Sequence, residues 1–159
     1  MGQIPATSPP SDVSDPSTAA VLIVDDNEQN LELVQAYLED LGCQIRTARD
    51  GAEAIKLVEA EQPDVILLDV MMPRMSGFQA CSRLKANPAT KDIPIVMVTA
   101  LNEVGDVERA VESGADDFLT KPVNKLELLT RVKSLLRVRQ LKRQLDKTLE
   151  EVRRLGGGA

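Results

Sequence analysis

The sequence of 159 residues contains no histidine and no tryptophan, and its only aromatic residues are Tyr37, Phe78 and Phe118. Without histidine, the chain can form no histidine-based catalytic triad, no histidine-ligated metal site and no imidazole pH switch. So few aromatic rings leave almost nothing on which nucleic-acid bases could stack. Cysteine is also scarce. Cys43 and Cys81 lie in mostly apolar patterns without CxxC spacing, which favours a reduced, cytoplasmic protein.

Long apolar runs and an excess of positive charge are missing as well. No apolar run approaches the roughly 18 residues of a membrane span, and the N-terminus has no signal-peptide pattern. Lys and Arg number 19 against 25 Asp and Glu, so the net charge is −6. Residues 21–136 hold 12 basic and 20 acidic side chains, whereas residues 137–159 hold 7 and 3. We therefore expect neither a membrane nor nucleic acid as a partner of this chain.

Composition divides the chain into four segments. Four of the nine prolines fall in the first sixteen residues among Ser, Thr and Gly, so residues 1–18 are predicted to be a disordered leader. A folded domain is expected at 19–137, and a helical extension at 138–155. Residues 156–159 are a glycine-rich tail.

From residue 19 onward, short apolar runs alternate with amphipathic segments. Residues 19–25 and 64–69 are continuous apolar stretches that run into an acid, which is typical of strands buried on both faces. Strands are predicted at 19–25, 44–48, 64–69, 95–99 and 117–120, and helices at 28–41, 51–61, 77–86, 103–113 and from 124 onward. This alternation predicts an α/β fold with a doubly wound, five-stranded parallel sheet of the flavodoxin-like (βα)5 type.

Polar residues stand at the carboxyl ends of these strands, where such sheets form their sites. Asp25 and Asp26 follow the first strand, Asp69 ends the third, Thr99 ends the fourth and Lys121 follows the fifth. Three neighbouring carboxylates repel one another by roughly a kcal/mol or more per pair, and a bound Mg²⁺ relieves that repulsion. Carboxylates, an ammonium and a hydroxyl together suit phosphoryl transfer, in which a carboxylate can act as the nucleophile.

Four motifs at these ends resemble the response-regulator receiver domain of two-component signalling, the CheY-like family. They are VDDN at 24–27, LDVMMPRMSG at 68–77, VTA at 98–100 and FLTKP at 118–122. The resemblance covers residues 19–137 and implies that Asp69 accepts a phosphoryl group from a sensor histidine kinase or a phosphotransfer protein. It also implies a signalling domain that catalyses only its own Mg²⁺-dependent phosphorylation and dephosphorylation, and not an enzyme acting on other substrates.

The resemblance assigns roles around the phosphoacceptor. Asp26, Asp69 and the backbone carbonyl of Met71 would bind Mg²⁺ directly, and Asp25 would act largely through water. Lys121 would contact the phosphoryl group, and the peptide bond that joins it to Pro122 is expected to be cis.

A conformational switch is implied by the same resemblance. Thr99 would hydrogen-bond a phosphoryl oxygen and move toward it, and Phe118 would swing inward in response, changing dimer geometry and output. Phe118 lacks the polar tip of the Tyr or His common at this position, so its inward state would depend on packing alone.

Two apolar residues flank the place where an attacking water would lie, and they predict a long-lived phosphoryl group. Met71 stands two residues after Asp69, and Leu101 stands two residues after Thr99; neither can orient a water molecule. We predict that the decay of the phosphorylated protein takes minutes or longer. Rapid hydrolysis that Met71→Asn leaves unchanged would contradict this prediction.

Each of these residues also has a plainer interpretation. Asp25 and Asp26 could cap the following helix together with Asn27, and Thr99 could be an ordinary strand residue. Lys121 could be a solvated lysine and Phe118 a core residue. One cap needs only one acid, so this interpretation leaves the rest of the acidic set unexplained.

Other families with a parallel sheet fit the motifs less well. A haloacid-dehalogenase-like phosphatase would need a second Asp two residues after its nucleophile, where this chain has Met71. A nucleotide-binding Rossmann domain would need a glycine-rich loop after the first strand. A pseudo-receiver, which is never phosphorylated, would not need the complete set of acids, Thr99 and Lys121.

The last helix carries an apolar seam beyond the residues needed for the domain core. Its members recur at alternating spacings of three and four residues: Val138, Leu141, Leu145, Thr148, Val152 and Leu155. These two and a half heptads favour a parallel coiled coil and a homodimer through the last two helices, and a solvated amphipathic helix is the alternative. The interleaved basic residues, among them Arg139, Lys142 and Arg143, are expected on its solvated surface.

Overall fold

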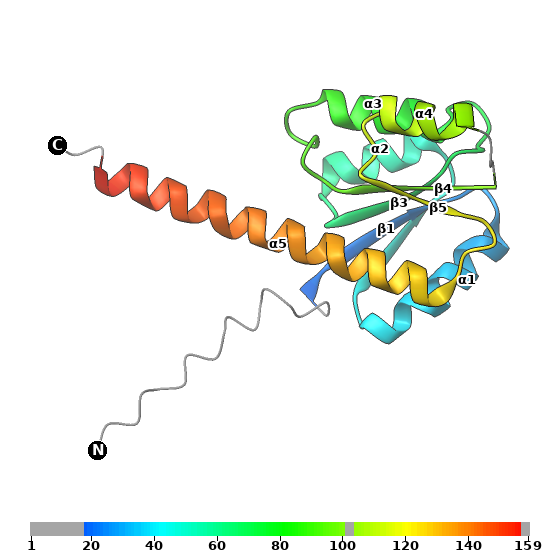
Figure 1. Cartoon of the computed structure of the whole chain (residues 1–159), viewed down its shortest axis with the longest axis horizontal. Coiled ribbons are helices and arrows are strands. Elements are labelled where there is room, and N and C mark those ends of the chain that lie inside the picture. Colours follow the sequence, from blue (N-terminus) through cyan, green and yellow to red (C-terminus); the bar gives the residue numbers. More distant parts are fainter. Residues whose placement is uncertain (1–17, 101–103, 157–159) are drawn as a thin grey trace, which may run out of the picture.

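The computed structural model describes residues 18–100 and 104–156, with the backbone alone for residues 104–107 (Figure 1). The strands are β1 (Ala20–Val24), β2 (Gln44–Ala48), β3 (Val65–Asp69), β4 (Ile95–Thr99) and β5 (Asp117–Thr120). The helices are α1 (Glu28–Leu38) with a 3-10 turn η3 (Glu39–Leu41), α2 (Gly51–Ala60), α3 (Gly77–Ala86), α4 (Val104–Glu112) and α5 (Lys125–Gly156). The predicted fold class is confirmed. The predicted leader, apart from Thr18, and the tail after Gly156 lie outside the described residues, as does Leu101.

All five strands are parallel, in the order β2-β1-β3-β4-β5. The strand order therefore reverses between β1 and β3, and the carboxyl ends of these two strands lie side by side. Helices α1 and α5 cover one face of the sheet, and α2, α3 and α4 cover the other (Figure 1). The reversal point is where doubly wound sheets leave an open crevice for a site.

The three inner strands, β1, β3 and β4, are buried on both faces, as their continuous apolar sequences predict, whereas the edge strands β2 and β5 are partly exposed. Within β1, Val21 and Ile23 point toward α1 and α5, whereas Leu22 and Val24 belong to the core under α2, α3 and α4. Because neighbouring side chains alternate between the two cores, each inner strand is apolar up to its carboxyl end. This close packing fixes the strand ends, and therefore the site, in space.

Polar caps define where the helices begin. The Asn27 side chain accepts a hydrogen bond from the Asn30 N–H at 3.2 Å, and Asp25 Oδ1 accepts one from the Asn27 N–H at 2.9 Å. The capping interpretation is therefore confirmed for Asn27 and wrong for Asp25 and Asp26. Ser76 begins α3 in a reciprocal capping box with Gln79.

Helix α5 is continuous over 32 residues, which corresponds to about 48 Å at the usual rise per residue. Leu128, Val132 and Leu136 bury its first half against the sheet. The second half extends away from the domain (Figure 1). No helix in the described part of the chain is both long and apolar enough to cross a membrane.

A group of charged and polar residues, which we term the polar clamp, holds α5 where it leaves the domain. It joins Arg139, Lys142 and Arg143 of α5 to Gln62, Asp64 and Asp92 at the amino-terminal edge of the sheet. Arg143 Nη1 lies 2.8 Å from Asp64 Oδ1, Lys142 Nζ lies 3.2 Å from Asp92 Oδ1, and Arg139 Nη2 donates to Gln62 Oε1 at 3.3 Å.

Lys142 and Arg143 lie on the solvated surface, as expected, but the expectation is wrong for Arg139. Arg139 is only 7% exposed, and burial lowers the pKa of its guanidinium. Asp64 is 7% exposed, and its Oδ2 accepts a hydrogen bond from the Ala20 N–H at 2.8 Å. The heptad spacing could not reveal this, because the acidic partners of these cations are distant in the sequence.

Candidate functional site

Three carboxylates meet where β1 and β3 end. Oxygen atoms of Asp25, Asp26 and Asp69 all lie within 4.8 Å of one another. Asp25 is 6% exposed and Asp69 is 3% exposed, whereas Asp26 is open to solvent. The sequence predicts that the doubly wound sheet brings these three acids together, and the structure places them side by side.

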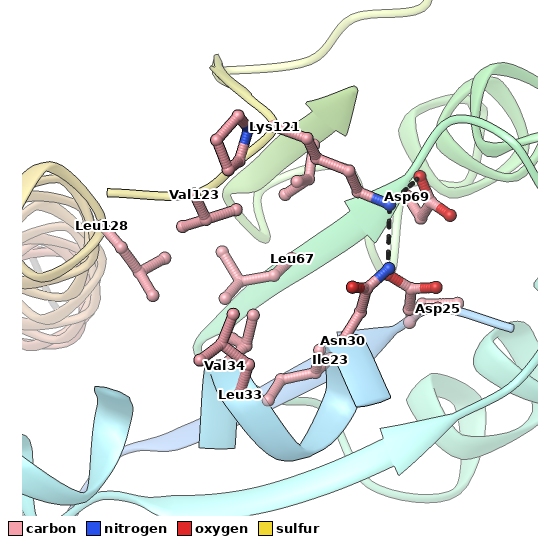
Figure 2. A pocket seen from close by; sticks show the side chains of 13 residues that line it. Ile23, Asp25, Asn30, Leu33, Val34, Leu67, Asp69, Lys121, Val123 and Leu128 are labelled. Atoms are coloured by element: carbon pink, nitrogen blue, oxygen red, sulfur yellow. Dashed lines mark hydrogen bonds and ion pairs between the residues drawn. The ribbon is translucent and has the colours of Figure 1, made fainter. Parts of the chain in front are cut away.

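Lys121 adds a positive charge to this acidic cluster. Its Nζ lies 3.2 Å from Asp69 Oδ1 and 3.4 Å from Asp25 Oδ2, and Figure 2 shows both contacts. The backbone N–H of Lys121 donates to the carbonyl of Thr99 at 2.8 Å, which ties the loop after β5 to the end of β4. The Lys121–Pro122 peptide bond is cis, as expected from the sequence.

The electrostatic balance of the site leaves Asp69 short of positive partners. Burial and the charge of Asp25 raise the pKa of Asp69 to about 6, against the opposing effects of Lys121 and the Met71 N–H. That N–H lies 3.4 Å from Asp69 Oδ1. A divalent cation would supply the missing charge, and a set of carboxylate and carbonyl oxygens is the ligand type that Mg²⁺ prefers.

We expect ionised Asp69 to destabilise the metal-free protein as the pH rises. Its folded pKa is about 6 against an ordinary value of 3.8, so the folded state binds the proton more tightly than the unfolded state. This loss of folding stability is absent when the pH is below 3.8 and grows as the pH rises from 3.8 to about 6. At higher pH it stays constant at about 3 kcal/mol.

Urea unfolding in EDTA would measure this cost by comparison with Asp69→Asn, which cannot ionise. The variant is expected to be more stable than the unsubstituted protein at neutral pH, and the difference is expected to vanish in acid. A stability difference that does not change with pH would contradict the prediction.

The remaining predicted site residues lie around this cluster at different depths. Thr99 is 8% exposed at the end of β4, opposite Thr120 in register. Phe118 is paired with Met97 in register but is 39% exposed, so it is not a core residue. The Met71 side chain is 63% exposed, and only its backbone approaches Asp69.

Gly77 is part of the site architecture, and the sequence reasoning gave it no role beyond the motif. A Cβ atom at Gly77 would lie 2.2 Å from the carbonyl oxygen of Asp69, so no other residue fits without moving the backbone. Its N–H donates to the carbonyl of Val70 at 3.0 Å, which fastens the start of α3 to the end of β3. The one feature of the sequence that could have indicated this close approach is a glycine directly after Ser76, the cap of α3.

A mostly apolar cavity of about 110 Å³ lies beside the acidic cluster (Figure 2). Ile23, Val34, Leu67 and Leu128 line it, and Asp25, Asp69 and Lys121 stand at one end. No local sequence pattern indicates this cavity, because its lining comes from four elements that are far apart in the chain: β1, α1, β3 and α5. Its apolar wall keeps water from one side of Asp69, consistent with the raised pKa of that carboxyl.

Comparison with known proteins gives a family match and several similar chains. The response regulator receiver domain model matches residues 21–133. The response regulator PleD of Caulobacter vibrioides is 44% identical over 139 residues, which make up 87% of this chain and 31% of PleD. The chain therefore corresponds to about a third of that relative.

Two solved structures share the fold. The receiver domain of a signal transduction histidine kinase from Syntrophus aciditrophicus has a TM-score of 0.71 and 39% identity, covering 75% of this chain and 90% of that one. The receiver domain of a Pseudomonas aeruginosa sensor histidine kinase has a TM-score of 0.70 and 29% identity, covering 75% and 98%. In the latter structure, a magnesium ion is coordinated in the active-site cleft.

Proposed function

This chain belongs to the response regulator receiver family, and from that premise we propose that it accepts a phosphoryl group on Asp69 from a histidine kinase or a phosphotransfer protein. Receiver domains of this family act in signalling and are not conventional enzymes. The observation that carries the proposal is the contact between Lys121 Nζ and buried Asp69, 3.2 Å apart, beside two further carboxylates. The test is phosphorylation of Asp69, developed in the Discussion.

In the proposed reaction, an oxygen of the Asp69 carboxylate attacks the phosphorus of a phosphohistidine. A bond forms between this oxygen and phosphorus as the bond between the donor nitrogen and phosphorus breaks, and the product is an aspartyl phosphate. Lys121 stabilises the negative charge of the phosphoryl oxygens from its position beside Asp69. The structure supports Asp69 over Asp25 and Asp26 as the acceptor, because it alone contacts both Lys121 and the Met71 N–H.

We propose that Asp26, Asp69 and the backbone carbonyl of Met71 hold Mg²⁺, with Asp25 acting largely through water. When bound, Mg²⁺ would neutralise charge on the carboxylates and on the phosphoryl oxygens. The proximity of the three carboxylates supports this assignment. The magnesium ion in the cleft of the Pseudomonas aeruginosa receiver domain is further support.

The proposed switch connects Asp69 to the outer strand of the sheet. Thr99 would move toward the phosphoryl group, and Phe118 would turn inward into the space that this movement opens. The hydrogen bond from the Lys121 N–H to the Thr99 carbonyl joins the ends of β4 and β5. The 39% exposure of Phe118 leaves its ring room to move from its present position.

We also propose the domain boundaries that the sequence predicts, with a receiver at 19–137 and an extension at 138–155 that pairs two copies of the chain. The predicted helix is present throughout the extension. The apolar residues of its seam remain between 49% and 86% exposed: Val138, Leu141, Leu145, Val152 and Leu155. A second copy of this helix would bury that stripe in a parallel coiled coil.

Leu145→Lys is expected to convert the dimer to a monomer, because it places a charge in the middle of the seam. Glu150→Gln is the matched control: it changes the net charge by the same amount, but Glu150 lies five residues on, outside the seam. Light scattering over a dilution series would give the mass of each variant. A dimer unchanged by Leu145→Lys, or a chain that is monomeric without substitution, would exclude the coiled coil.

A further inference from the structure

A groove of about 600 Å³ lies between α3 and α4, on the face of the sheet opposite α1 and α5. Arg74, Arg83 and Arg109 line it, together with Met75, Phe78 and Glu112. None of these residues belongs to the acidic cluster, and the proposed phosphoryl transfer uses none of them. The groove is therefore a surface separate from the phosphorylation site.

The charge of this groove is opposite to that of its surroundings. Among the residues whose side chains the structure describes, three arginines and one glutamate line it, in a stretch of chain (21–136) with 12 basic and 20 acidic side chains. Among the described residues, none of the three guanidinium groups forms an ion pair or a hydrogen bond, whereas other arginines do: Arg49 with Glu28, Arg131 with Asp117 and Arg143 with Asp64. These three cations are thus available to a ligand.

The arginines are spread along the groove. Arg74 precedes α3 and Arg83 lies in its last turn, and the ten residues of α3 span about 15 Å. Arg74 has a φ of 70°, a left-handed conformation that few residues other than glycine adopt. Arg109 has its guanidinium carbon 5.0 Å from the centre of the Phe78 ring. Stacking of this kind uses the flat face of the guanidinium and leaves its N–H edge free for a carboxylate.

We propose that this groove binds an acidic peptide segment of a partner protein, with carboxylates on the arginines and an apolar side chain on Met75 and Phe78. Arginine binds carboxylates through paired, charge-assisted hydrogen bonds. A nucleotide would also bring negative charge, but its base would need an aromatic face on which to stack. Arg109 covers Phe78, and the other two aromatic residues, Tyr37 and Phe118, do not line the groove.

The proposal can be tested with a twelve-residue acetylated peptide that repeats Glu-Glu-Leu, titrated into the ¹⁵N-labelled full chain. We expect chemical-shift changes at amides of α3 and α4. In the variant R74N/R83Q/R109Q, binding should weaken at least about tenfold, as the loss of charge-assisted hydrogen bonds requires. Asparagine is chosen at position 74 because it tolerates the left-handed conformation.

A matched control variant, K56Q/K133Q/K147Q, removes the same number of positive charges from exposed positions outside the groove. It should bind the peptide as the unsubstituted chain does. Equal weakening in both variants, shift changes centred on the basic end of α5, or equal binding of a peptide with Gln in place of Glu would overturn the proposal. Displacement of the peptide by ATP at lower concentration would assign the groove to nucleotides instead.

The outcome of the peptide titration does not depend on whether Asp69 is phosphorylated. Acetyl phosphate should modify Asp69 equally in both variants, because none of the substituted residues belongs to the acidic cluster or is Lys121, its positive partner. Peptide binding without phosphorylation would support the groove and contradict the proposed function. Phosphorylation without peptide binding would do the reverse.

Discussion

Asp69→Asn is expected to abolish phosphorylation of the chain by acetyl phosphate and Mg²⁺, measured as the mass gain of one phosphoryl group on the intact protein. The amide has nearly the shape of the carboxylate but lacks its negative charge and its nucleophilic oxygen. Asp69 is the only one of the three clustered acids that contacts both Lys121 and the Met71 N–H. We therefore expect neither Asp25 nor Asp26 to replace it.

Two further variants make this result specific. Asp25→Asn should slow phosphorylation without abolishing it, because in our proposal Asp25 acts on Mg²⁺ largely through water and does not accept the phosphoryl group. Asp92→Asn, an exposed acid at the opposite edge of the sheet, should have no effect on phosphorylation. A mass gain that persists in Asp69→Asn would show that another residue is the acceptor. No mass gain in an unsubstituted protein that binds Mg²⁺ would identify a pseudo-receiver.

Asp64→Ala is expected to lower the free energy of unfolding by about 3–5 kcal/mol, the usual cost of breaking a buried charge pair from one side. The substitution removes the carboxylate that lies 4.0 Å from the Nε of buried Arg139, and it removes the acceptor for the Ala20 N–H. It also removes the partner of Arg143. Urea unfolding followed by circular dichroism would give the change.

Two companion variants separate the two causes of that loss. Asp64→Asn keeps an oxygen for the Ala20 N–H and should therefore cost less than Asp64→Ala. The double variant D64A/R139L replaces the stranded guanidinium with an apolar side chain and should recover part of the stability. A loss within about 0.5 kcal/mol for Asp64→Ala, the range of ordinary surface substitutions, would show that the polar clamp does not stabilise the domain.

The sheet and its helices could be predicted because their sequence signals are local. Each inner strand is a short apolar run whose members fill two cores at once. Strands β2, β4 and β5 have the predicted bounds. The helix boundaries follow from Asn27, Asp50 and Ser76, each a polar side chain that accepts a hydrogen bond from the first turn. The convergence of the acids then follows from the rule that parallel strands end at the same edge.

The rest depended on contacts between distant residues, which no local pattern records. Arg139 matches a solvated helix position by its spacing, and only the fold shows that Asp64, 75 residues earlier, lies beside it. The backbone contact that excludes any side chain at Gly77 likewise depends on how closely α3 approaches β3. The arginine groove joins a loop to two helices, and its residues are not periodic in the sequence.

Because α5 is continuous, the number of residues along it determines the direction in which its side chains point. The polar clamp fixes this helix at Arg139 and Arg143. Each successive residue beyond that point projects its side chain about 100° further around the helix axis. Inserting one residue after the clamp would therefore rotate Leu145 and Val152 by more than a quarter turn relative to the receiver. Inserting seven would nearly restore their direction and displace them by about 10 Å. In the proposed coiled-coil dimer, the number of residues between clamp and seam would thus set the direction in which each receiver faces around the common axis.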